Sequence, residues 1–388
     1  MEALVQLRHH IHKNPETAFQ EFETAKVLKA YLVEAGYSED LFVECANPGF
    51  YIDLQGTGEP IGEPKVVALR ADMDALKMSE DSDLPYKSVN PKAAHMCGHD
   101  GHVTALVGVG RAIKLQQSLI PSNCKVRLFF QPAEEEVNGA KKMIEEGILE
   151  GVDEVYGCHN TPGKSLGILV CPDTTAAASA HFLTIRVKGR GGHGAFPERC
   201  QDVVLTACQI TQALATITGR AISCHEAAVL TVCKITAGSA PNVFPNEAVL
   251  EGSLRTYSPE VLETVMKRIH TIVHSVAAAS DCTAEIEFPF DCPPTVNHKE
   301  NAEIVRRAYA KEVGPEFVID SLPAPGSEDF AFYLQHRPGA MFGLYSGKPG
   351  FLHTSRFNFD DESLPFIIRA FLSILSDRFG TQLSLQLC

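Results

Sequence analysis

Side chains that can bind a metal ion or move a proton follow several apolar runs of this sequence. The runs 65–71, 125–130, 154–157 and 340–345 have the composition of short buried strands. Acid, thiol or imidazole groups come after them, in the segments Asp72-Met73-Asp74, Glu134-Glu135-Glu136, Cys158-His159 and His353. Ligands of open parallel sheets bind at the carboxyl ends of the strands. We therefore expect these groups to meet at one sheet edge.

A denser cluster of such groups lies just before a predicted helix that begins near Gly98. The segment reads His95-Met96-Cys97-Gly98-His99-Asp100-Gly101-His102. A single histidine at a helix start is most often only exposed, but that explanation fails for a thiol, imidazoles and a carboxylate together. Cys97 and His99 flank a glycine and can face the same way from a loop. This arrangement suits a metal that accepts nitrogen and sulfur ligands.

The acidic pair Glu134-Glu135 permits a division of labour. Neighbouring acids usually belong to a solvated surface, but this pair follows a buried strand and the turn at Pro132. One carboxylate can hold a metal ion while the other takes a proton from water. We interpret Glu136 as a bystander.

The residues alone leave three classes of protein open. A metal-dependent hydrolase uses all of the groups at the predicted edge. The first alternative is a hydrolase in which Cys97 is the nucleophile and His99 or His102 its base. A thiolate nucleophile, however, has no need of the acidic pair and of the remaining imidazoles at the same edge. The second alternative is a non-catalytic binding protein on the same fold. We favour the metal-dependent hydrolase.

The order of the elements predicts an α/β domain that is interrupted by a smaller one. Up to about residue 180, helical and strand patterns alternate, which is typical of βαβ units in a largely parallel sheet. The next elements follow the ferredoxin-like order βαββαβ, with expected ranges 181–187, 202–218, 227–237, 248–256, 259–279 and 282–288. Helices over 300–313 and 362–378, and one opening at Ser327, then resume the first pattern. We predict domains at 1–180 with 294–388, and at 181–293.

Composition excludes some functions. There are 34 Lys and Arg against 48 Asp and Glu, a net charge of −14, which argues against nucleic-acid binding. We expect no membrane-spanning segment and see no secretory signal. The 12 cysteines form no CxxC pair, and several stand in apolar runs, including Cys124, Cys208 and Cys233. We expect mostly buried free thiols and a cytoplasmic protein.

The motifs, taken in order, resemble the M20 family of metallopeptidases and aminoacylases. Within this family they resemble the subgroup that holds hippurate hydrolase, bacterial N-acyl-amino-acid amidohydrolases and plant auxin-conjugate hydrolases. The matching motifs run nearly from end to end: His12-Lys13-Asn14-Pro15-Glu16, Arg70-Ala71-Asp72-Met73-Asp74-Ala75-Leu76, Cys97-Gly98-His99-Asp100-Gly101-His102, Gln131-Pro132-Ala133-Glu134-Glu135, Gly191-Gly192-His193, Asn242-Val243-Phe244-Pro245-Asn246, Ser327-Glu328-Asp329-Phe330 and His353-Thr354. Lys77, where the subgroup usually has Pro, and Gly194, where Ala is common, depart from the pattern.

The resemblance implies a zinc-peptidase-like catalytic domain that holds two divalent metal ions. The metal ligands it implies are Cys97, His99, Glu135, His159 and His353, with Cys97 bridging the ions. Glu134 is implied as the general base and acid. Arg70 stands where the wider superfamily has a metal-binding histidine, so Asp72 is expected to support the ligands rather than to bind metal.

The inserted domain is implied to act as a lid and dimerisation domain. His193 and Asn242 are expected to steady the oxyanion, and Arg255 to grip the substrate's carboxylate. We expect a homodimer in which His193 serves the partner's site; action in cis and an ordinary loop position are the alternatives.

The implied activity is hydrolysis of the amide bond of an N-acyl-amino acid or of a similar small peptide-like amide. Zn, Mn, Co and Ni all suit the expected ligands. Acetyl, benzoyl and indole-acetyl conjugates all remain candidate substrates.

Overall fold

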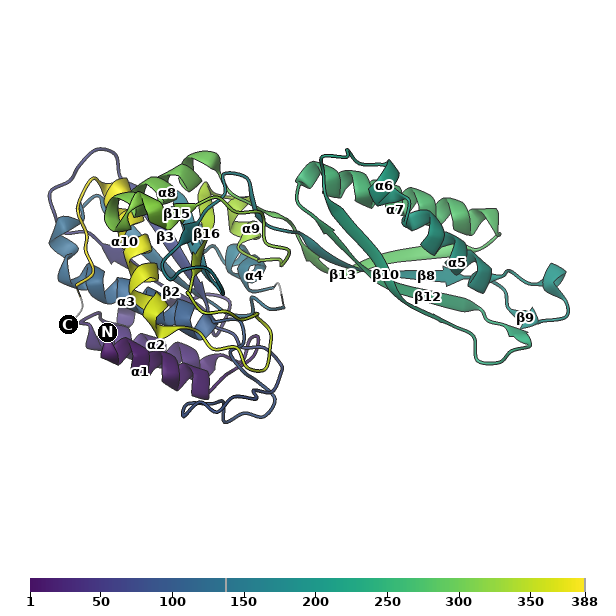
Figure 1. The fold of residues 1–388 in the computed structure, drawn as a ribbon, viewed down its shortest axis with the longest axis horizontal. Helices are drawn as coiled ribbons and strands as arrows, with labels where there is room; N and C mark the ends of the chain where they lie inside the picture. The colour runs from purple at the N-terminus through teal and green to yellow at the C-terminus, as the bar shows by residue number, and fades with distance from the viewer. Residues whose placement is uncertain (137, 387–388) are drawn as a thin grey trace. The chain divides into compact units, whose positions relative to one another are not determined.

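The computed structural model describes residues 1–136 and 138–386, which divide into two compact units (Figure 1). The first unit comprises Met1–Ala176, Val296–Leu322 and Asp329–Cys388, and the second Ala177–Thr295 and Pro323–Glu328. The sequence had placed residues 323–328 with the catalytic domain. In the structure Ala324 O accepts a hydrogen bond from Ala178 N at 2.9 Å, and Pro325 O accepts one from Arg255 Nη1 at 3.2 Å. These long-range contacts leave no periodic pattern in the sequence.

The first unit is built on a mixed eight-stranded sheet. Its spatial order is β1 (Phe42–Glu44), β2 (Phe50–Gln55), β4 (Cys124–Gln131), β3 (Lys65–Asp72), β5 (Glu154–Thr161), β16 (Gly339–Tyr345), β6 (Leu169–Val170) and β15 (Val318–Ile319). Strands β4, β3, β5 and β16 pair in parallel, so their carboxyl ends share one edge. These are the four strands expected from the apolar runs. Strands β1 and β2, which sequence patterns missed, add an antiparallel hairpin beside β4.

Alternating side chains of the central strands enter two different cores. Val67 and Leu69 of β3 pack in one core, and Ala68 between them packs in the other. The larger core includes residues of α1 (Glu2–Lys13), α2 (Phe22–Glu34), α3 (His99–Leu115), α8 (Lys299–Val313) and α10 (Leu364–Phe379). The smaller core includes residues of α4 (Gly139–Glu145) and α9 (Ala331–Leu334). Helix α9 begins four residues later than the expected start at Ser327. Because both faces are covered, the strands are mostly apolar, with Arg70 and Arg127 as buried exceptions, and polar groups gather at their ends.

The second unit has a four-stranded antiparallel sheet, and its elements follow the predicted order. The sheet order is β10 (Ala228–Ala237), β12 (Glu247–Thr256), β8 (Ala180–Lys188) and β13 (Thr283–Cys292). Helices α5 (Val203–Leu214), α6 (Ile217–Arg220) and α7 (Pro259–Ala279) contribute to its core. The expected helix over 202–218 is divided between α5 and α6. Helix α7 has the expected bounds because Ser258 caps it, accepting a hydrogen bond from Val261 N.

The cysteines differ in burial. All those in the described part of the chain are free thiols, and Cys124 is buried as predicted. Cys208 and Cys233, in contrast, are exposed. Cys208 is not among the residues of α5 that face the core, and Cys233 lies at a bulge of the edge strand β10. Within residues 1–136 and 138–386, no helix has both the length and the apolar character that crossing a membrane requires.

Helix α1 contributes a buried network of charged side chains to the first unit. Asp100 Oδ2 lies 2.8 Å from His12 Nδ1 and 3.4 Å from Arg8 Nη1, and Glu80 Oε1 lies 3.4 Å from His12 Nε2. All four residues are buried. Burial alone lowers the pKa of His12, but the bonds to Asp100 and Glu80 outweigh it and raise the pKa to about 9. His12 is therefore a cation at neutral pH.

The raised pKa predicts that stability falls in mildly alkaline solution. Because the folded-state pKa exceeds the unfolded value near 6.5, the contribution of His12 is complete below that pH and is lost as pH rises through 9. At about 1.4 kcal/mol per pKa unit the loss amounts to about 3 kcal/mol. Urea unfolding at several pH values measures it in the wild type and in His12→Gln. Parallel pH curves for the two proteins would contradict the assignment.

Candidate metal centre

Five side chains predicted as metal ligands converge at the shared edge of the central strands. Cys97 lies two residues before His99, the first residue of α3, and Glu135 follows β4. His159 lies within β5, which extends four residues beyond its expected end, and His353 lies in the loop after β16. The structure has these side chains at the edge where the sequence placed them, except that His159 lies inside its strand rather than just after it.

A glycine makes the turn between the first two of these ligands possible. Gly98 has a φ of 100°, and a Cβ atom there would lie 2.2 Å from Asn160 Oδ1. Any other residue would meet both a strained backbone and a direct clash. Because Gly98 turns the chain in this way, Cys97 and His99 present their side chains to the same site.

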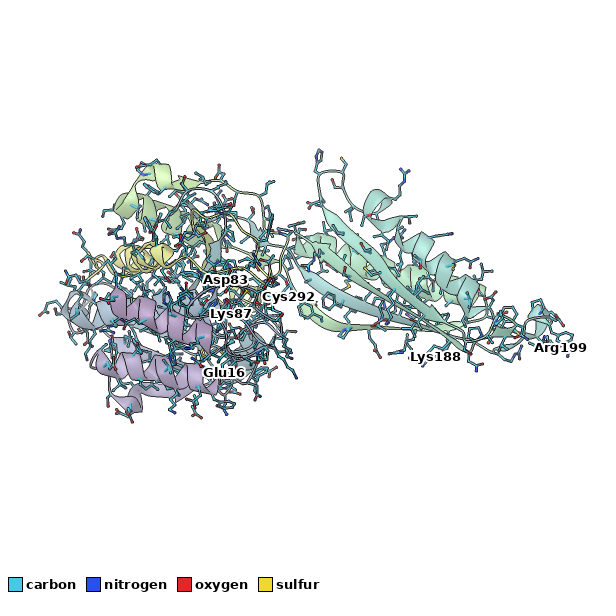
Figure 2. The ribbon with its side chains drawn as sticks, turned by 60° about the horizontal axis from the view of Figure 1, so that its bottom comes forward. Glu16, Asp83, Lys87, Lys188, Arg199 and Cys292 are labelled. Atoms are coloured by element: carbon cyan, nitrogen blue, oxygen red, sulfur yellow. The ribbon has the colours of Figure 1, made fainter. Side chains whose placement is uncertain are left out.

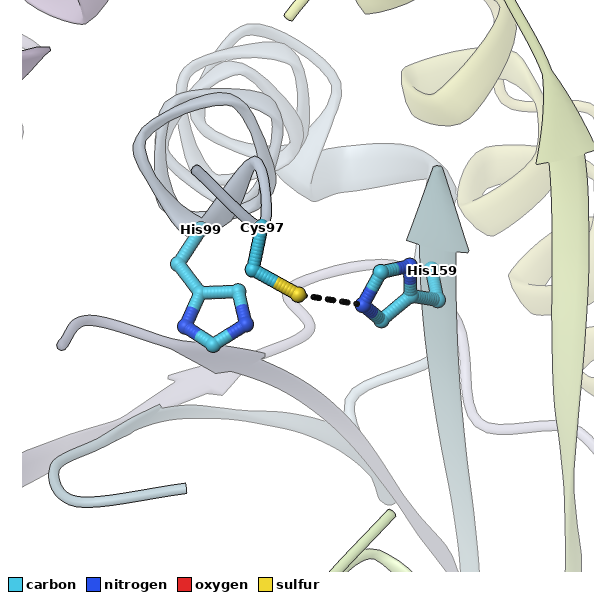
Figure 3. A group of neighbouring side chains, drawn as sticks. All are labelled: Cys97, His99 and His159. Carbon is cyan, nitrogen blue, oxygen red and sulfur yellow. Dashed lines mark hydrogen bonds between the residues drawn. The ribbon is translucent and has the colours of Figure 1, made fainter. Parts of the chain in front are cut away.

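The ligating atoms form two overlapping groups that share Cys97. One group is Cys97, His99 and His159, and the other is Cys97, Glu135 and His353; within each, the atoms lie within 4.8 Å of one another. Cys97 Sγ is 3.3 Å from His159 Nε2 and 3.3 Å from His353 Nε2. Figure 3 shows the sulfur directed at His159, with the His99 ring beside it. A thiolate common to two groups suits a ligand that bridges two metal ions.

Contacts outside the cluster leave the inward nitrogen atoms of two histidines available. His99 Nδ1 lies 2.9 Å from Asp74 O, and His159 Nδ1 lies 2.7 Å from Asn160 O. Each ring can donate there and keep Nε2 for a metal. His99 Nε2 and Glu135 Oε1 are buried and have no hydrogen-bond partner among the described residues. Buried polar atoms without partners, together with the mixed thiol, imidazole and carboxylate donors, fit divalent metal ions.

The pKa values of the side chains in the cluster also fit metal binding. Burial, with Glu135 nearby, raises the pKa of Cys97 well above its usual value. Burial raises the pKa of Glu135 to about 7 and lowers that of His159 to about 3. The thiol thus keeps its proton, because burial and Glu135 outweigh the opposing effect of His99 on its pKa. A bound cation adds positive charge beside the sulfur and displaces the proton.

Asp72 and His102 belong to a supporting network rather than to the ligand groups around Cys97. Asp72 Oδ2 accepts a hydrogen bond from Arg70 Nη1 at 2.7 Å, and Asp72 Oδ1 lies 2.7 Å from His102 Nδ1. His102 Nε2 lies 2.6 Å from Asn160 Oδ1. With both ring nitrogens engaged, His102 is not placed to act as a base for Cys97. This placement weakens the alternative in which His102 serves a nucleophilic Cys97, because helix α3 turns the His102 side chain toward β3 and β5.

Sequence reasoning missed the part played by Asp74. Its carbonyl oxygen holds His99, and its Oδ2 accepts a hydrogen bond from Glu135 N at 3.0 Å. One residue therefore orients two predicted ligands. The alternation Asp72-Met73-Asp74 after a buried strand was the available signal, since both acids point to the same side.

Glu134 is placed differently from its neighbours. It is buried, and its Oε1 accepts a hydrogen bond from Asp329 N at 3.3 Å. Its carboxylate also lies within 4.8 Å of the ligating atoms of His99 and Glu135. Glu136, by contrast, is exposed and forms an ion pair with Lys77. The acidic run therefore contains one buried carboxylate beside the predicted ligands and one ordinary surface acid.

The remaining predicted residues lie in the second unit. His193 ends the short strand β9 (Gly192–His193), which pairs with β11 (Val243–Phe244), and Gly194 N donates to Asn242 O at 2.8 Å. The structure thus brings His193 and Asn242 together at an exposed two-stranded antiparallel sheet. Arg255 lies near the end of β12.

Known proteins resemble the whole chain. The model of peptidase family M20/M25/M40 matches residues 68–377. N-acetyl-L-cysteine deacetylase of Bacillus subtilis (strain 168) is 37% identical over 88% of this chain and 80% of its own length. Hippurate hydrolase of Campylobacter jejuni is 34% identical over 92% of each chain. A crystal structure of a dinuclear metal-binding M20 peptidase from Bacillus subtilis superposes with a TM-score of 0.84 and 27% identity, covering 98% of each chain.

The shared position of Cys97 predicts the effect of removing it. Cys97→Ala takes one ligand from each group, so we expect it to retain less than one metal ion per chain after dialysis, against two in the wild type. Cys158→Ala is the matched control, because Cys158 is also a buried free thiol, adjacent to His159, but belongs to neither group. Metal content measured by mass spectrometry decides, and a Cys97→Ala protein that keeps two ions would exclude the bridging arrangement.

Proposed function

Because the chain belongs to peptidase family M20/M25/M40, we propose that it is a metal-dependent amidohydrolase that removes the acyl group from an N-acyl-amino acid or cleaves a similar small peptide-like amide. Its membership confirms the resemblance drawn from the motifs. The observation that carries the proposal is the buried carboxylate of Glu134 beside two ligand groups that share Cys97. Divalent ions held there supply a Lewis acid that polarises the amide carbonyl and lowers the pKa of water.

Glu134 is proposed to move the proton. Its carboxylate accepts a proton from the attacking water, whose oxygen forms the new bond to the carbonyl carbon. As the C–N bond breaks, Glu134 returns that proton to the leaving amine. The products are a carboxylic acid and a free amino acid. The hydrogen bond from Asp329 N supports this role because it fixes one oxygen of a carboxylate that lies beside the predicted ligands His99 and Glu135.

Three residues of the second unit are proposed to bind the substrate. His193 and Asn242 are assigned to the developing oxyanion, and their proximity across β9 and β11 supports a joint role. Arg255 is assigned to the substrate's carboxylate, since a guanidinium can bind a carboxylate through two parallel hydrogen bonds.

A homodimer is proposed on the basis of the edge strand β10. This strand has β12 on one side only, and its Val229 and Ile235 are 54% and 45% exposed. Pairing with a second copy would satisfy the open backbone groups and cover these side chains. In such a dimer His193 is proposed to complete the partner's site, with action in cis as the alternative. The free thiols favour a reducing compartment, and we propose the cytoplasm.

The function is tested with a grid of N-acyl-amino acids. We expect release of the free amino acid from at least one acetyl, benzoyl or indole-acetyl conjugate, loss of activity with EDTA, and restoration by Zn²⁺, Mn²⁺, Co²⁺ or Ni²⁺. The pattern of rates across the grid identifies the acyl group and the metal. Activity that survives complete metal removal would favour a nucleophilic role for Cys97. A metal-loaded protein inert across the grid would favour a binding protein.

The acidic pair predicts two different kinds of failure. Glu134→Gln keeps the size of the side chain and the proposed ligands, so metal content should remain near that of the wild type while kcat falls on the order of 10²–10⁴-fold. Glu135→Ala should lose metal as well as activity. Metal analysis and steady-state kinetics on the same samples separate the roles. Equal metal loss in both variants would show that the division of labour is wrong.

A further inference from the structure

Glu21 is a fully buried acid at the start of α2, and the mechanism above does not use it. Its Oε1 accepts a hydrogen bond from Ala133 N at 2.9 Å, across 112 residues of sequence. Ala133 is the residue before Glu134. Burying a carboxyl group is unfavourable unless hydrogen bonds compensate for its lost hydration. We therefore asked what the bond between Glu21 and Ala133 stabilises.

Ala133 is in a backbone conformation that its side chain does not favour. It is fully buried and has a φ of 53°, in the left-handed region. For a residue other than glycine this conformation is unfavourable and persists only where neighbouring contacts impose it. The contacts here are hydrogen bonds: Ala133 N donates to Glu21 Oε1, and Gly139 N donates to Ala133 O at 3.2 Å. Hydrogen bonds to Glu21 and Gly139 thus fix the turn that leads to Glu134 and Glu135.

The segment between α1 and α2, which carries Glu21, also contacts the turn that contains Asp74 and Ala75. Ala75 N donates to Glu16 O at 2.8 Å, and Thr17 pairs with Ala75 in a parallel bridge. Asp74, the residue before Ala75, is the one that orients His99 and Glu135. The connection between α1 and α2 therefore reaches both turns on which Glu135 depends.

This segment is itself anchored firmly enough to act as a support. The carboxylate of Glu16 accepts hydrogen bonds from Thr24 N and Thr24 Oγ1, each at 2.8 Å, and from Glu23 N at 3.2 Å. These bonds tie it to the first turn of α2, where unpaired backbone N–H groups favour an anion. Figure 2 labels Glu16 beside the N-terminal helices.

We propose that Glu21 is a positioning residue for the metal centre. By accepting the hydrogen bond of Ala133 it fixes the turn that presents Glu134 and Glu135, and so sets the affinity for metal. The inference rests on the proposed two-metal function. It concerns a residue that contacts neither metal nor substrate.

The protonation state of Glu21 makes glutamine a conservative replacement for it. Burial, together with the nearby Asp74 carboxylate, raises the pKa of Glu21 to about 8. The carboxyl group is therefore mostly neutral at pH 7. Glutamine has the same shape and keeps a carbonyl acceptor for Ala133 N, whereas leucine fills a similar volume and offers none.

The test compares metal affinity in Glu21→Gln and Glu21→Leu by competition with a chelator, and the visible spectrum of the Co²⁺-loaded proteins. We expect Glu21→Leu to bind metal roughly 10–100-fold more weakly with an altered spectrum, and Glu21→Gln to stay within about threefold of the wild type. Glu21→Asp keeps the acid but withdraws it by one methylene, so it should also lose affinity. If circular dichroism shows that Glu21→Leu does not fold, Glu21→Asp replaces it in the test.

Glu146→Leu is the matched control. Glu146 accepts a hydrogen bond from the N–H of Ala46, another buried alanine with a positive φ, of 54°, which precedes no proposed ligand. This variant should lose stability without losing metal affinity. Wild-type affinity in folded Glu21→Leu or Glu21→Asp would overturn the inference, as would an equal loss in Glu21→Gln. Failure of the wild type itself to bind metal would instead overturn the proposed function.

Discussion

The parallel pairing of β4, β3, β5 and β16 is the constraint on which the rest of the site depends. Parallel register brings the carboxyl ends of all four strands to one edge, with Asp72 opposite Gln131 and His159 opposite Gly343. Both faces of these strands are covered by helices, so most of their residues are apolar and most of their polar groups lie at the ends. The concentration of thiol, imidazole and carboxylate groups at one edge follows from this topology.

Gathering such groups in a buried place requires a surrounding set of partners. Asp72 would be unstable as a buried anion, but Arg70 and the neighbouring histidines outweigh the effect of burial and hold its pKa well below the usual range. Asp74 and Asn160 orient the histidine rings from behind. Among the described residues, His99 Nε2 and Glu135 Oε1 keep no hydrogen-bond partner, and both atoms belong to proposed ligands.

The sequence predicted the elements and the proposed ligands because both leave local signals. Apolar runs followed by His, Cys or Glu mark strand ends, and Ser258-Pro259 marks the start of α7 within one residue. The β1–β2 hairpin was missed, although Asn47-Pro48-Gly49 between its strands is a turn signal. The orientation of His102, the attachment of residues 323–328 and the contact of Glu21 with Ala133 depend on packing between distant segments. Periodicity and spacing carry no information about such contacts.

The insertion of the second unit has a consequence for how the chain acquires its structure. Cys97 and His353 are 256 residues apart, and the strands and helices of the inserted sheet lie between them. During synthesis the inserted unit emerges whole while β16 and α10 are still missing, so it can fold first, whereas the first unit must wait for its C-terminal part. Closing so long a loop is entropically unfavourable and slow unless the inserted unit has already brought its ends together. Early folding of the second unit thus helps the distant segments of the first unit to meet.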